Sequence, residues 1–370
     1  MKRREFLHVG GVGLAAGASV VAAPAIAQSA PELKWRLSST FPKSLDTLFG
    51  ASDSFAKYCH EMTDGRWQIQ PFAAGEIVGM PQALDAVSNG TVEMIHGPGY
   101  YYVGRDPTLA IMADIPFMMN ARQRNAWLYE GGAQALINEF LAPLNVYAIP
   151  GGNTGTQMGG WFRKEVKTVA DLQGLKFRIA GLAGQVLAKM GAVPQQLPGG
   201  DIYPALERGT IDAAEWVGPY DDEKLGFAKI APFYYYPGFW EGAPGVHFWF
   251  GKGKWEELPK AYKQIAMSAA TQAGLEMTAK YDARNPAALR RLVAGGAQLR
   301  PFSQEILEAG FKASNELYDE ISAKNANFKK LYEHARAFRN EEYLWWQVAE
   351  YTFDNFMIRA RLSSSGPAPR

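Results

Sequence analysis

One sequence motif occurs twice in the chain: a predicted helix, then a glycine, then a predicted strand. This repeat is the feature that most constrains the fold. The second copy, Pro204–Trp216, reads PALERGTIDAAEW. We expect a helix that ends at Gly209, because glycine takes the positive φ of a helix C-cap without strain, and a buried strand over Ile211–Trp216. The first copy, Ala83–Gly97, reads ALDAVSNGTVEMIHG and breaks at Gly90. Two copies of one unit predict two lobes of similar α/β design.

The ends of the two phrases carry different side chains. The second copy delivers Glu215 and Trp216, whereas the first carries Glu93 and leads through a Gly-Pro-Gly turn to Tyr100 and Tyr101. Ligands of open α/β sheets bind at the carboxyl ends of the strands. The pattern therefore predicts a pocket with a carboxylate from one lobe and a tyrosine lid from the other.

Length and composition limit the function. The chain has 370 residues, 47% of them hydrophobic and 20% charged, which favours two globular lobes over a disordered chain. The formal net charge is +1 and the pI is near 7.7, so the sequence has no basic surplus typical of nucleic-acid binders. Cys59 is the single cysteine, which excludes an intrachain disulfide and a cysteine-based zinc site.

Residues 1–27 have the organisation of an export signal. An Arg3-Arg4 pair precedes an apolar run over residues 9–23, and Ala25-Ile26-Ala27 fits a peptidase site. We predict a twin-arginine type signal that is cleaved after Ala27, leaving a periplasmic protein. The alternative is a retained anchor, but the run is rich in Gly and Ala and short for a membrane span.

The order of predicted elements gives a domain organisation for the mature chain. The turn-forming run Gly151–Gln157 is the expected crossing between lobes and a natural hinge. The expected parts are lobe 1 (residues 28–152), lobe 2 (153–240), a return to lobe 1 with a connecting helix (241–302), C-terminal helices that form a dimerisation arm (303–362), and a disordered tail (363–370).

Hydrophobic periodicity predicts the longer helices. We expect a helix over Asp46–Thr63 with Asp46 as its N-cap, and one helix over Gln123–Leu141. A strand is expected over Gln298–Phe302. The last predicted helix, Glu341–Arg361, is unusually rich in large apolar residues, more than one packed face of a terminal helix needs.

The same residues resemble a known family. The two-lobed exported layout, the phrase ending in Glu215 and Trp216, and the strand Gly174–Arg178 resemble the substrate-binding subunits of TRAP transporters, over essentially all of residues 33–361. Segments 212–227 and 233–248 resemble the branch that binds 2-oxo acids such as pyruvate, or 2-hydroxy acids such as lactate. The resemblance implies an α/β, two-lobed periplasmic binding protein of the type II-like, Venus flytrap class with long C-terminal helices.

The resemblance also implies that Arg178 clamps the carboxylate of the ligand. Guanidinium presents a planar fork of donors that matches a carboxylate, and it stays charged when it is desolvated. The alternative for Arg178 is a surface arginine in an ordinary ion pair.

In the 2-oxo acid branch a cation is implied beside the ligand. Its ligands would be Gln157, Glu215, the Trp216 carbonyl and Glu241. All of these groups offer oxygen, which suits one hard cation, sodium or calcium, better than a soft transition metal. The alternatives are a salt-bridged Glu215 at a strand end, a hydrogen-bonding Gln157 in the hinge and a surface charge for Glu241.

Further ligand contacts are expected around the same pocket. Asn153 lies beside the hinge, and Tyr100 and Tyr101 follow the strand end of the first lobe. Apolar walls are expected from aromatic residues, namely Phe41, Trp216, Phe239 and Trp240. A lone histidine near a strand end is usually structural, so we assign no ligand or acid–base role to His96.

The expected partners are a small 2-oxo or 2-hydroxy carboxylate, the membrane permease subunits of a TRAP transporter, and a second copy of the chain. Two other classes remain as alternatives, a metal-dependent enzyme acting on a small carboxylate and a ligand-binding sensory module. The sequence shows no nucleophile elbow, no His-Glu-x-x-His zinc motif and no phosphate loop, which disfavours the enzyme.

Overall fold

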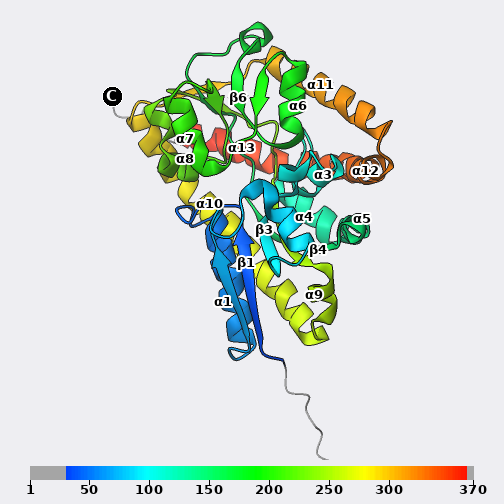
Figure 1. Ribbon diagram of the computed structural model, residues 1–370. Helices are drawn as coiled ribbons and strands as arrows, with labels where there is room; N and C mark the ends of the chain where they lie inside the picture. The colour runs from blue at the N-terminus through cyan, green and yellow to red at the C-terminus, as the bar shows by residue number, and fades with distance from the viewer. Residues whose placement is uncertain (1–30, 365–370) are drawn as a thin grey trace, which may run out of the picture. The chain divides into compact units, whose positions relative to one another are not determined.

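The computed structural model describes residues 31–364, and it describes side chains as far as Arg361. The predicted export signal over residues 1–27 lies outside the described part of the chain, as do the last six residues of the predicted tail. Helix α13 includes Ser363 and Ser364, which corrects the expected start of that tail. Residues from Leu33 onward form one unit, built on two sheets (Figure 1).

The first sheet has five strands in the order β2-β1-β3-β10-β4. Strand β1 pairs in parallel with β2 and β3, whereas β10 runs antiparallel to both β3 and β4. Every residue of β10 is buried, as expected for a central strand of apolar and aromatic residues. The strands are β1 (Leu33–Ser39), β2 (Trp67–Phe72), β3 (Met94–Gly97), β4 (Val146–Asn153) and β10 (Gly245–Gly251).

Six helices belong to this part of the chain: α1 (Leu48–Met62), α2 (Ala83–Ser88), α3 (Thr108–Ala113), α4 (Ala121–Tyr129), α5 (Ala133–Leu141) and α9 (Lys252–Glu257). Asp46 does not cap α1, contrary to the prediction. Its carboxylate accepts hydrogen bonds from Tyr220 and Lys224 instead, and no side chain caps the helix at Thr47. These long-range partners of Asp46 cannot be inferred from local sequence.

The single helix predicted over residues 123–141 is two helices, α4 and α5. Gly131 and Gly132 separate them, and Gly132 has φ +80°. A β-carbon on Gly131 would lie 2.7 Å from the carbonyl oxygen of Trp127, so the turn needs glycine at this position. The glycine pair therefore overrides the helical periodicity on either side of it.

The second sheet has six strands in the order β11-β9-β5-β8-β6-β7. Its strands are β5 (Gly160–Phe162), β6 (Lys176–Arg178), β7 (Val193–Gln195), β8 (Ala213–Ala214), β9 (Phe233–Tyr236) and β11 (Gln298–Pro301), and its nearby helices are α6 (Gly181–Lys189), α7 (Gly199–Glu207) and α8 (Pro219–Leu225). Gly209 has φ +71° after α7, which confirms the predicted cap. The strand expected over Ile211–Trp216 is shorter, with ladder pairing only at Ala213 and Ala214.

Three connections cross between the sheets. The chain leaves the first sheet at the end of β4 and returns to it at β10. Helix α10 (Lys260–Ala294) is 35 residues long and contacts both β4 and α8. It leads to β11, which pairs with β9 in the second sheet. The expected return to the first lobe over residues 241–302 therefore ends before β11.

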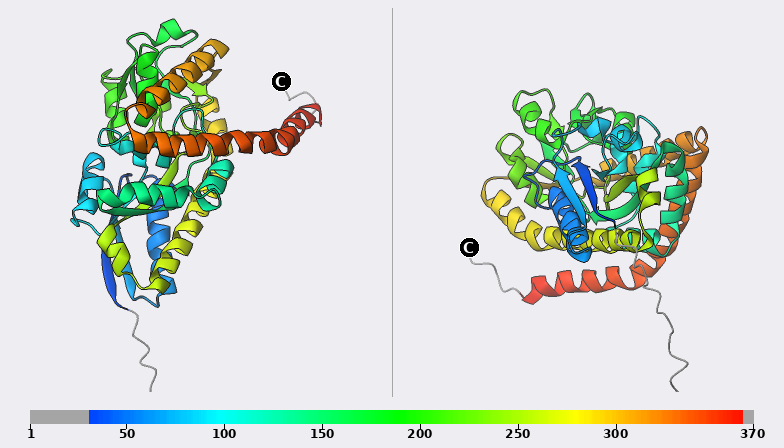
Figure 2. Two further views of the ribbon diagram at one scale, coloured as in Figure 1. Left: turned by 90° about the vertical axis from the view of Figure 1, so that its right-hand side faces the viewer. Right: turned by 60° about the horizontal axis from the view of Figure 1, so that its bottom comes forward.

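The C-terminal helices are α11 (Gln304–Ser322), α12 (Ala326–Val348) and α13 (Glu350–Ser364). Helix α11 packs against α6, whereas the end of α12 and α13 form an arm that Figure 2 shows projecting beyond the sheets. The prediction of one helix over Glu341–Arg361 is wrong. Ala349 has non-helical backbone angles, φ −93° and ψ −84°, and separates α12 from α13. Large apolar side chains stay exposed along the arm, among them Trp345 at 58% and Phe353 at 64%.

Candidate functional site

Parallel pairing of β6 with β8 brings Arg178 and Glu215 together. Arg178 is the last residue of β6, and Glu215 directly follows β8. Because the two strands run in parallel, their carboxyl ends meet at the same edge of the sheet, and the Glu215 amide donates to the Arg178 carbonyl at 3.1 Å. Both side chains are buried, each with 2% of its surface exposed. A buried charge pair of this kind marks this sheet edge as the candidate site.

The guanidinium of Arg178 is held by three hydrogen bonds. Its Nε donates to the Leu197 carbonyl at 3.1 Å. Its Nη1 donates both to the Glu215 carbonyl at 2.8 Å and to the Glu215 carboxylate at 2.5 Å. The Trp216 ring lies 5.0 Å from the guanidinium carbon, in the geometry of a cation–π contact. Arg178 is thus oriented by backbone groups and by an aromatic face.

Two further polar side chains approach from the hinge. The backbone amide of Gln157 donates to the backbone carbonyl of Glu241 at 3.1 Å. The backbone amide of Gly238 donates to the backbone carbonyl of Gln157 at 3.0 Å. This bonding fixes the 237–242 loop against the end of the crossing between lobes. Gln157 and Glu241 are both buried, although the loop position of Glu241 suggested a surface charge as the alternative.

Several buried polar atoms here lack a hydrogen-bond partner among the described residues. They include Gln157 Oε1, Glu241 Oε2 and Trp216 Nε1. An unpartnered buried oxygen costs on the order of 1 to 3 kcal/mol, so an acceptor of this kind is a candidate for a bound cation or ligand. Two of the three atoms are oxygens on residues that the resemblance nominates for the cation.

The electrostatics of the two glutamates point the same way. Burial raises the pKa of Glu241 well above its ordinary value, and the neighbouring Glu215 carboxylate raises it further. Burial also raises the pKa of Glu215, while Arg178 opposes that shift. A single arginine therefore faces two buried carboxylates, and a cation between them would favour the ionised state of both.

Tyr100 and Tyr101 reach this site from the first sheet. Tyr100 lies close enough to Glu241, and Tyr101 close enough to Arg178, for the members of each pair to interact electrostatically. The backbone of the same segment meets the second lobe, because Gln196 Nε2 donates to the Tyr101 carbonyl at 3.0 Å. Both phenols are buried, and burial raises the pKa of each of them. The two tyrosines close the site from the lobe opposite Arg178.

These side chains enclose a cavity with about 10 Å³ of free volume, roughly room for one water molecule. Arg178 is the one cationic side chain among the described residues that line it. A small organic acid needs more space, so it enters only if side chains move or the lobes separate. The lining residues are Phe41, Leu48, Tyr100, Tyr101, Thr154, Gln157, Arg178, Glu215, Trp216, Val217, Pro244 and Val246.

Five of these lining residues were not predicted from the sequence. Leu48 begins α1, Thr154 follows β4, Val217 follows the Glu215–Trp216 pair, and Pro244 and Val246 flank the start of β10. Four of them are apolar and form part of one wall of the cavity. Periodicity assigns such residues to the core, and only the tertiary arrangement places them at a ligand site.

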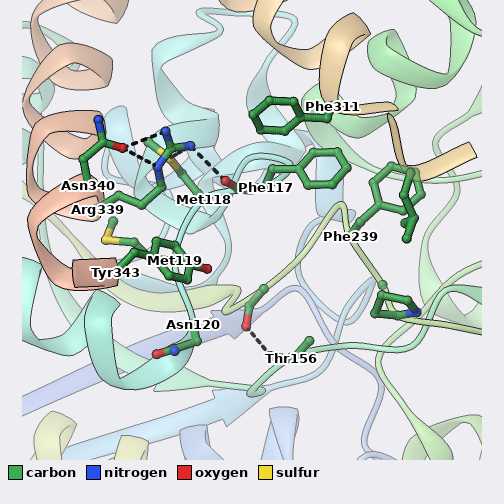
Figure 3. Close-up of a pocket in the computed structure, with 14 residues that line it drawn as sticks. Phe117, Met118, Met119, Asn120, Thr156, Phe239, Phe311, Arg339, Asn340 and Tyr343 are labelled. Atoms are coloured by element: carbon green, nitrogen blue, oxygen red, sulfur yellow. Dashed lines mark hydrogen bonds between the residues drawn. The ribbon is translucent and has the colours of Figure 1, made fainter. Parts of the chain in front are cut away.

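Three predicted ligand contacts, Asn153, Phe239 and Trp240, do not line this cavity, and neither does the proposed cation ligand Glu241. The side-chain Nδ2 of Asn153 donates to the Ala243 carbonyl at 3.1 Å, and its Oδ1 accepts from the backbone amide of Gly155. The Asn153 side chain therefore stabilises the hinge. Phe239 stacks on Phe117 with ring centroids 4.9 Å apart. It lines a second, larger cavity of about 520 Å³ on the side of the 237–242 loop where α12 passes (Figure 3). Trp240 packs against Phe177 and Phe302 instead.

The other acidic and histidine candidates of the first lobe are structural. Glu93 forms a hydrogen-bonded ion pair with Arg36 at 2.9 Å. His96 lies between Ser52, which is within hydrogen-bonding distance of its Nδ1, and Phe248, on whose ring it stacks. Burial lowers the pKa of His96 to about 3, so the imidazole is neutral.

Two features are absent from the described part of the chain. No group of three or more His, Cys, Asp and Glu side chains is arranged there to hold a metal ion. The cation set considered above has two carboxylates supplemented by amide and backbone oxygens, which is typical of hard cations. In residues 31–364 no helix is long and apolar enough to cross a membrane.

Comparison with known proteins identifies close relatives. The monocarboxylate 2-oxoacid-binding periplasmic protein of Nostoc sp. is 49% identical over 360 residues, covering 96% of this chain and 99% of that protein. A TRAP transporter solute-binding protein from Bordetella bronchiseptica is 47% identical, with a TM-score of 0.89 over 90% of this chain and 100% of that one. That structure is a mixed-occupancy dimer, with calcium and picolinate in one active site and the other site apo.

A second solved structure extends the comparison. The TRAP periplasmic solute-binding protein of Pseudoalteromonas atlantica, with bound sodium and pyruvate, is 36% identical and has a TM-score of 0.84. The match covers 90% of this chain and 100% of that one, and it confirms the predicted two-lobed binding-protein fold with long C-terminal helices. The sequence pattern of bacterial extracellular solute-binding protein family 7 matches residues 38–325. The chain therefore belongs to bacterial extracellular solute-binding protein family 7, with the substrate-binding proteins of TRAP transporters as its relatives.

Proposed function

We propose that this protein captures a small 2-oxo or 2-hydroxy monocarboxylate together with one hard cation and delivers it to a TRAP membrane permease. The observation that carries the proposal is the buried Arg178 beside two buried carboxylates, Glu215 and Glu241, at the meeting point of the lobes. Relatives named or solved with a 2-oxo acid, sodium or calcium support the same assignment.

Each group has a defined role in this proposal. Arg178 binds the carboxylate of the ligand, since it is the one cation among the described lining residues. Gln157, Glu215, Glu241 and the Trp216 carbonyl supply oxygen ligands, and the unpartnered Oε1 of Gln157 and Oε2 of Glu241 fit that use. The bound cation would neutralise carboxylate charge and attract the oxygens of the ligand. Tyr100 and Tyr101 close the site from the first lobe.

The proposed cycle requires motion about the crossings between the sheets, including those near residues 153 and 245. The lobes are open when the protein is empty and close when ligand and cation join Arg178 and Gln157 to the Tyr100 region. The small free volume of the cavity supports this, since about 10 Å³ admits no organic acid without movement. The closed form then docks on the permease.

Titration with pyruvate tests the function directly. With sodium or calcium present, tryptophan fluorescence is expected to change saturably, because Trp216 lines the cavity and Trp240 precedes Glu241. The NMR signals of pyruvate should broaden or shift without the appearance of a product. A new product signal would support the metal-dependent enzyme, and the absence of saturable binding across small 2-oxo and 2-hydroxy acids would contradict the proposal.

Export and localisation also enter the proposal. The Arg3-Arg4 pair and the Ala25-Ile26-Ala27 segment favour a twin-arginine signal, and the relatives carry the word periplasmic in their names. A periplasmic receptor also explains the single, buried Cys59, because no reactive thiol is exposed to an oxidising compartment.

We further infer a homodimer formed through the arm. Helix α13 exposes Phe353 and Met357 on one side and Tyr351 and Ile358 on the other, as the 3.6-residue period places them. A helix that is apolar on two sides is typical of a covered helix. The large cavity in Figure 3 is also apolar and is lined by α12 at Tyr343. A second copy would cover both surfaces, and the dimeric relative from Bordetella bronchiseptica supports this inference.

Truncation tests the dimer. Removal of residues 349–370 deletes the whole of α13 and is expected to convert a dimer into a monomer in sedimentation velocity, because the exposed apolar side chains of α13 are lost. Removal of residues 362–370 alone is the matched control and should leave the dimer intact, since the exposed residues of α13 remain. A dimer that survives the longer truncation would exclude α13 as the dimerisation element.

A further inference from the structure

The hydrogen bonds of Arg178 leave too few donors free for a two-point grip on a ligand. Guanidinium has five N–H donors, and a bidentate carboxylate uses two that project from adjacent nitrogens. Nε donates to the Leu197 carbonyl, and Nη1 donates to both the carbonyl and the carboxylate of Glu215. Only the N–H groups of Nη2 remain, and both project from one nitrogen. One existing bond must therefore break before Arg178 can bind a carboxylate bidentately.

The bond to the Glu215 carboxylate is the one that can be exchanged. The Leu197 and Glu215 carbonyls belong to the backbone, and that of Glu215 lies beside the β6–β8 pairing, which the Glu215 amide extends to the Arg178 carbonyl. The Glu215 side chain can rotate. It is also a proposed cation ligand, so it has an alternative partner of positive charge if it leaves Arg178.

We propose that Glu215 is an internal occupant of the carboxylate site, and that the cation makes Arg178 available by drawing the Glu215 carboxylate away from it. The inference rests on the proposed function and adds the order of binding, in which the cation precedes the ligand. Without the cation, Glu215 competes with the ligand for Arg178. With the cation bound, Glu215 is used elsewhere and the ligand carboxylate takes its place. The small cavity supports the exchange, since withdrawal of Glu215 also makes space beside Arg178.

Glu241 provides a matched comparison on the same chain. It is also a buried carboxylate in the proposed cation set, but among the described residues Arg178 forms its ion pair and side-chain hydrogen bond with Glu215 and not with Glu241. Neutralising Glu241 should weaken binding of the cation without releasing Arg178. Neutralising Glu215 should both weaken binding of the cation and release Arg178.

The test measures pyruvate binding by calorimetry in buffer with a divalent-ion chelator and with choline in place of sodium. The wild-type protein is expected to bind at least tenfold more weakly there than with sodium or calcium. Glu215→Gln is expected to bind pyruvate without the cation at least tenfold more tightly than the wild type does under the same conditions. Glu241→Gln should show no such gain. Glu215→Ala, which removes the competing group entirely, should show the gain as well.

The outcomes separate this inference from the proposed function. A wild-type protein that binds no 2-oxo or 2-hydroxy acid even with cation present would overturn the function itself. A wild-type protein that binds with cation, together with folded Glu215→Gln and Glu215→Ala variants that gain nothing without it, would overturn only the exchange. An equal gain in Glu241→Gln would also overturn it, because general charge removal would then explain the effect.

Discussion

Arg178→Ala is expected to abolish measurable binding of small 2-oxo acids while the protein stays folded. The substitution removes the one cation among the described residues that line the cavity. Truncating one partner of a buried, hydrogen-bonded charge pair costs about 2 to 5 kcal/mol, or roughly 30-fold to several thousand-fold in Kd. The backbone pairing of β6 with β8 does not depend on the side chain, so the fold should survive. Calorimetry with pyruvate and cation gives the affinity.

Arg178→Lys is the matched control for this prediction. Lysine keeps the positive charge but offers a compact ammonium in place of the planar fork. It should bind more weakly than wild type and more tightly than the alanine variant. Circular dichroism and thermal unfolding check the fold of both variants. Wild-type affinity in a folded Arg178→Ala protein would exclude Arg178 as the clamp.

Gly181→Ala is expected to obstruct closure of the lobes. Gly181 begins α6 in the second lobe with φ +66°, and a β-carbon there would lie 2.9 Å from the β-carbon of Tyr100 in the first lobe. Overpacking of this kind costs about 1 to 3 kcal/mol, so the affinity for pyruvate should fall roughly 10- to 100-fold. Titration with cation present measures the loss.

Gly174→Ala controls for the backbone strain of the same substitution. Gly174 also has a positive φ, +72°, but a β-carbon there meets no atom within 4 Å. Both variants should lose a similar, small amount of unfolding free energy, because alanine is strained at positive φ. Only Gly181→Ala should lose affinity. Equal affinity in the two variants would contradict the assignment of the Gly181 and Tyr100 contact to closure.

Local chemistry predicted the strand end that carries Glu215 and Trp216. Gly209 follows α7 with a positive φ, and the segment after it leads to these two residues. The family resemblance, and not the local pattern, assigned Arg178 to the ligand carboxylate and Gln157, Glu215, the Trp216 carbonyl and Glu241 to the cation. Those roles remain predictions.

Long-range contacts explain what the sequence did not predict. Leu48 and Val246 look like core residues, and only the approach of the two lobes exposes them to the cavity. Asn153 was expected at the ligand because it lies beside the hinge, but the Ala243 carbonyl occupies its amide. Asp46 looks like an N-cap, yet Lys224 lies within ion-pair distance from a distant part of the chain. In each case the partner is remote in sequence.

A crystal structure of the protein crystallised with pyruvate and calcium tests most directly the central claim that ligand and cation bind side by side at Arg178. Anomalous scattering locates the cation independently of the ligand. The account predicts one calcium peak among the oxygens of Gln157, Glu215, Trp216 and Glu241, with the pyruvate carboxylate on Arg178. It also predicts that the Glu215 carboxylate has left the guanidinium. Pyruvate or calcium found instead in the 520 Å³ cavity beside α12, with Arg178 still bonded only to Glu215 and backbone groups, would contradict it.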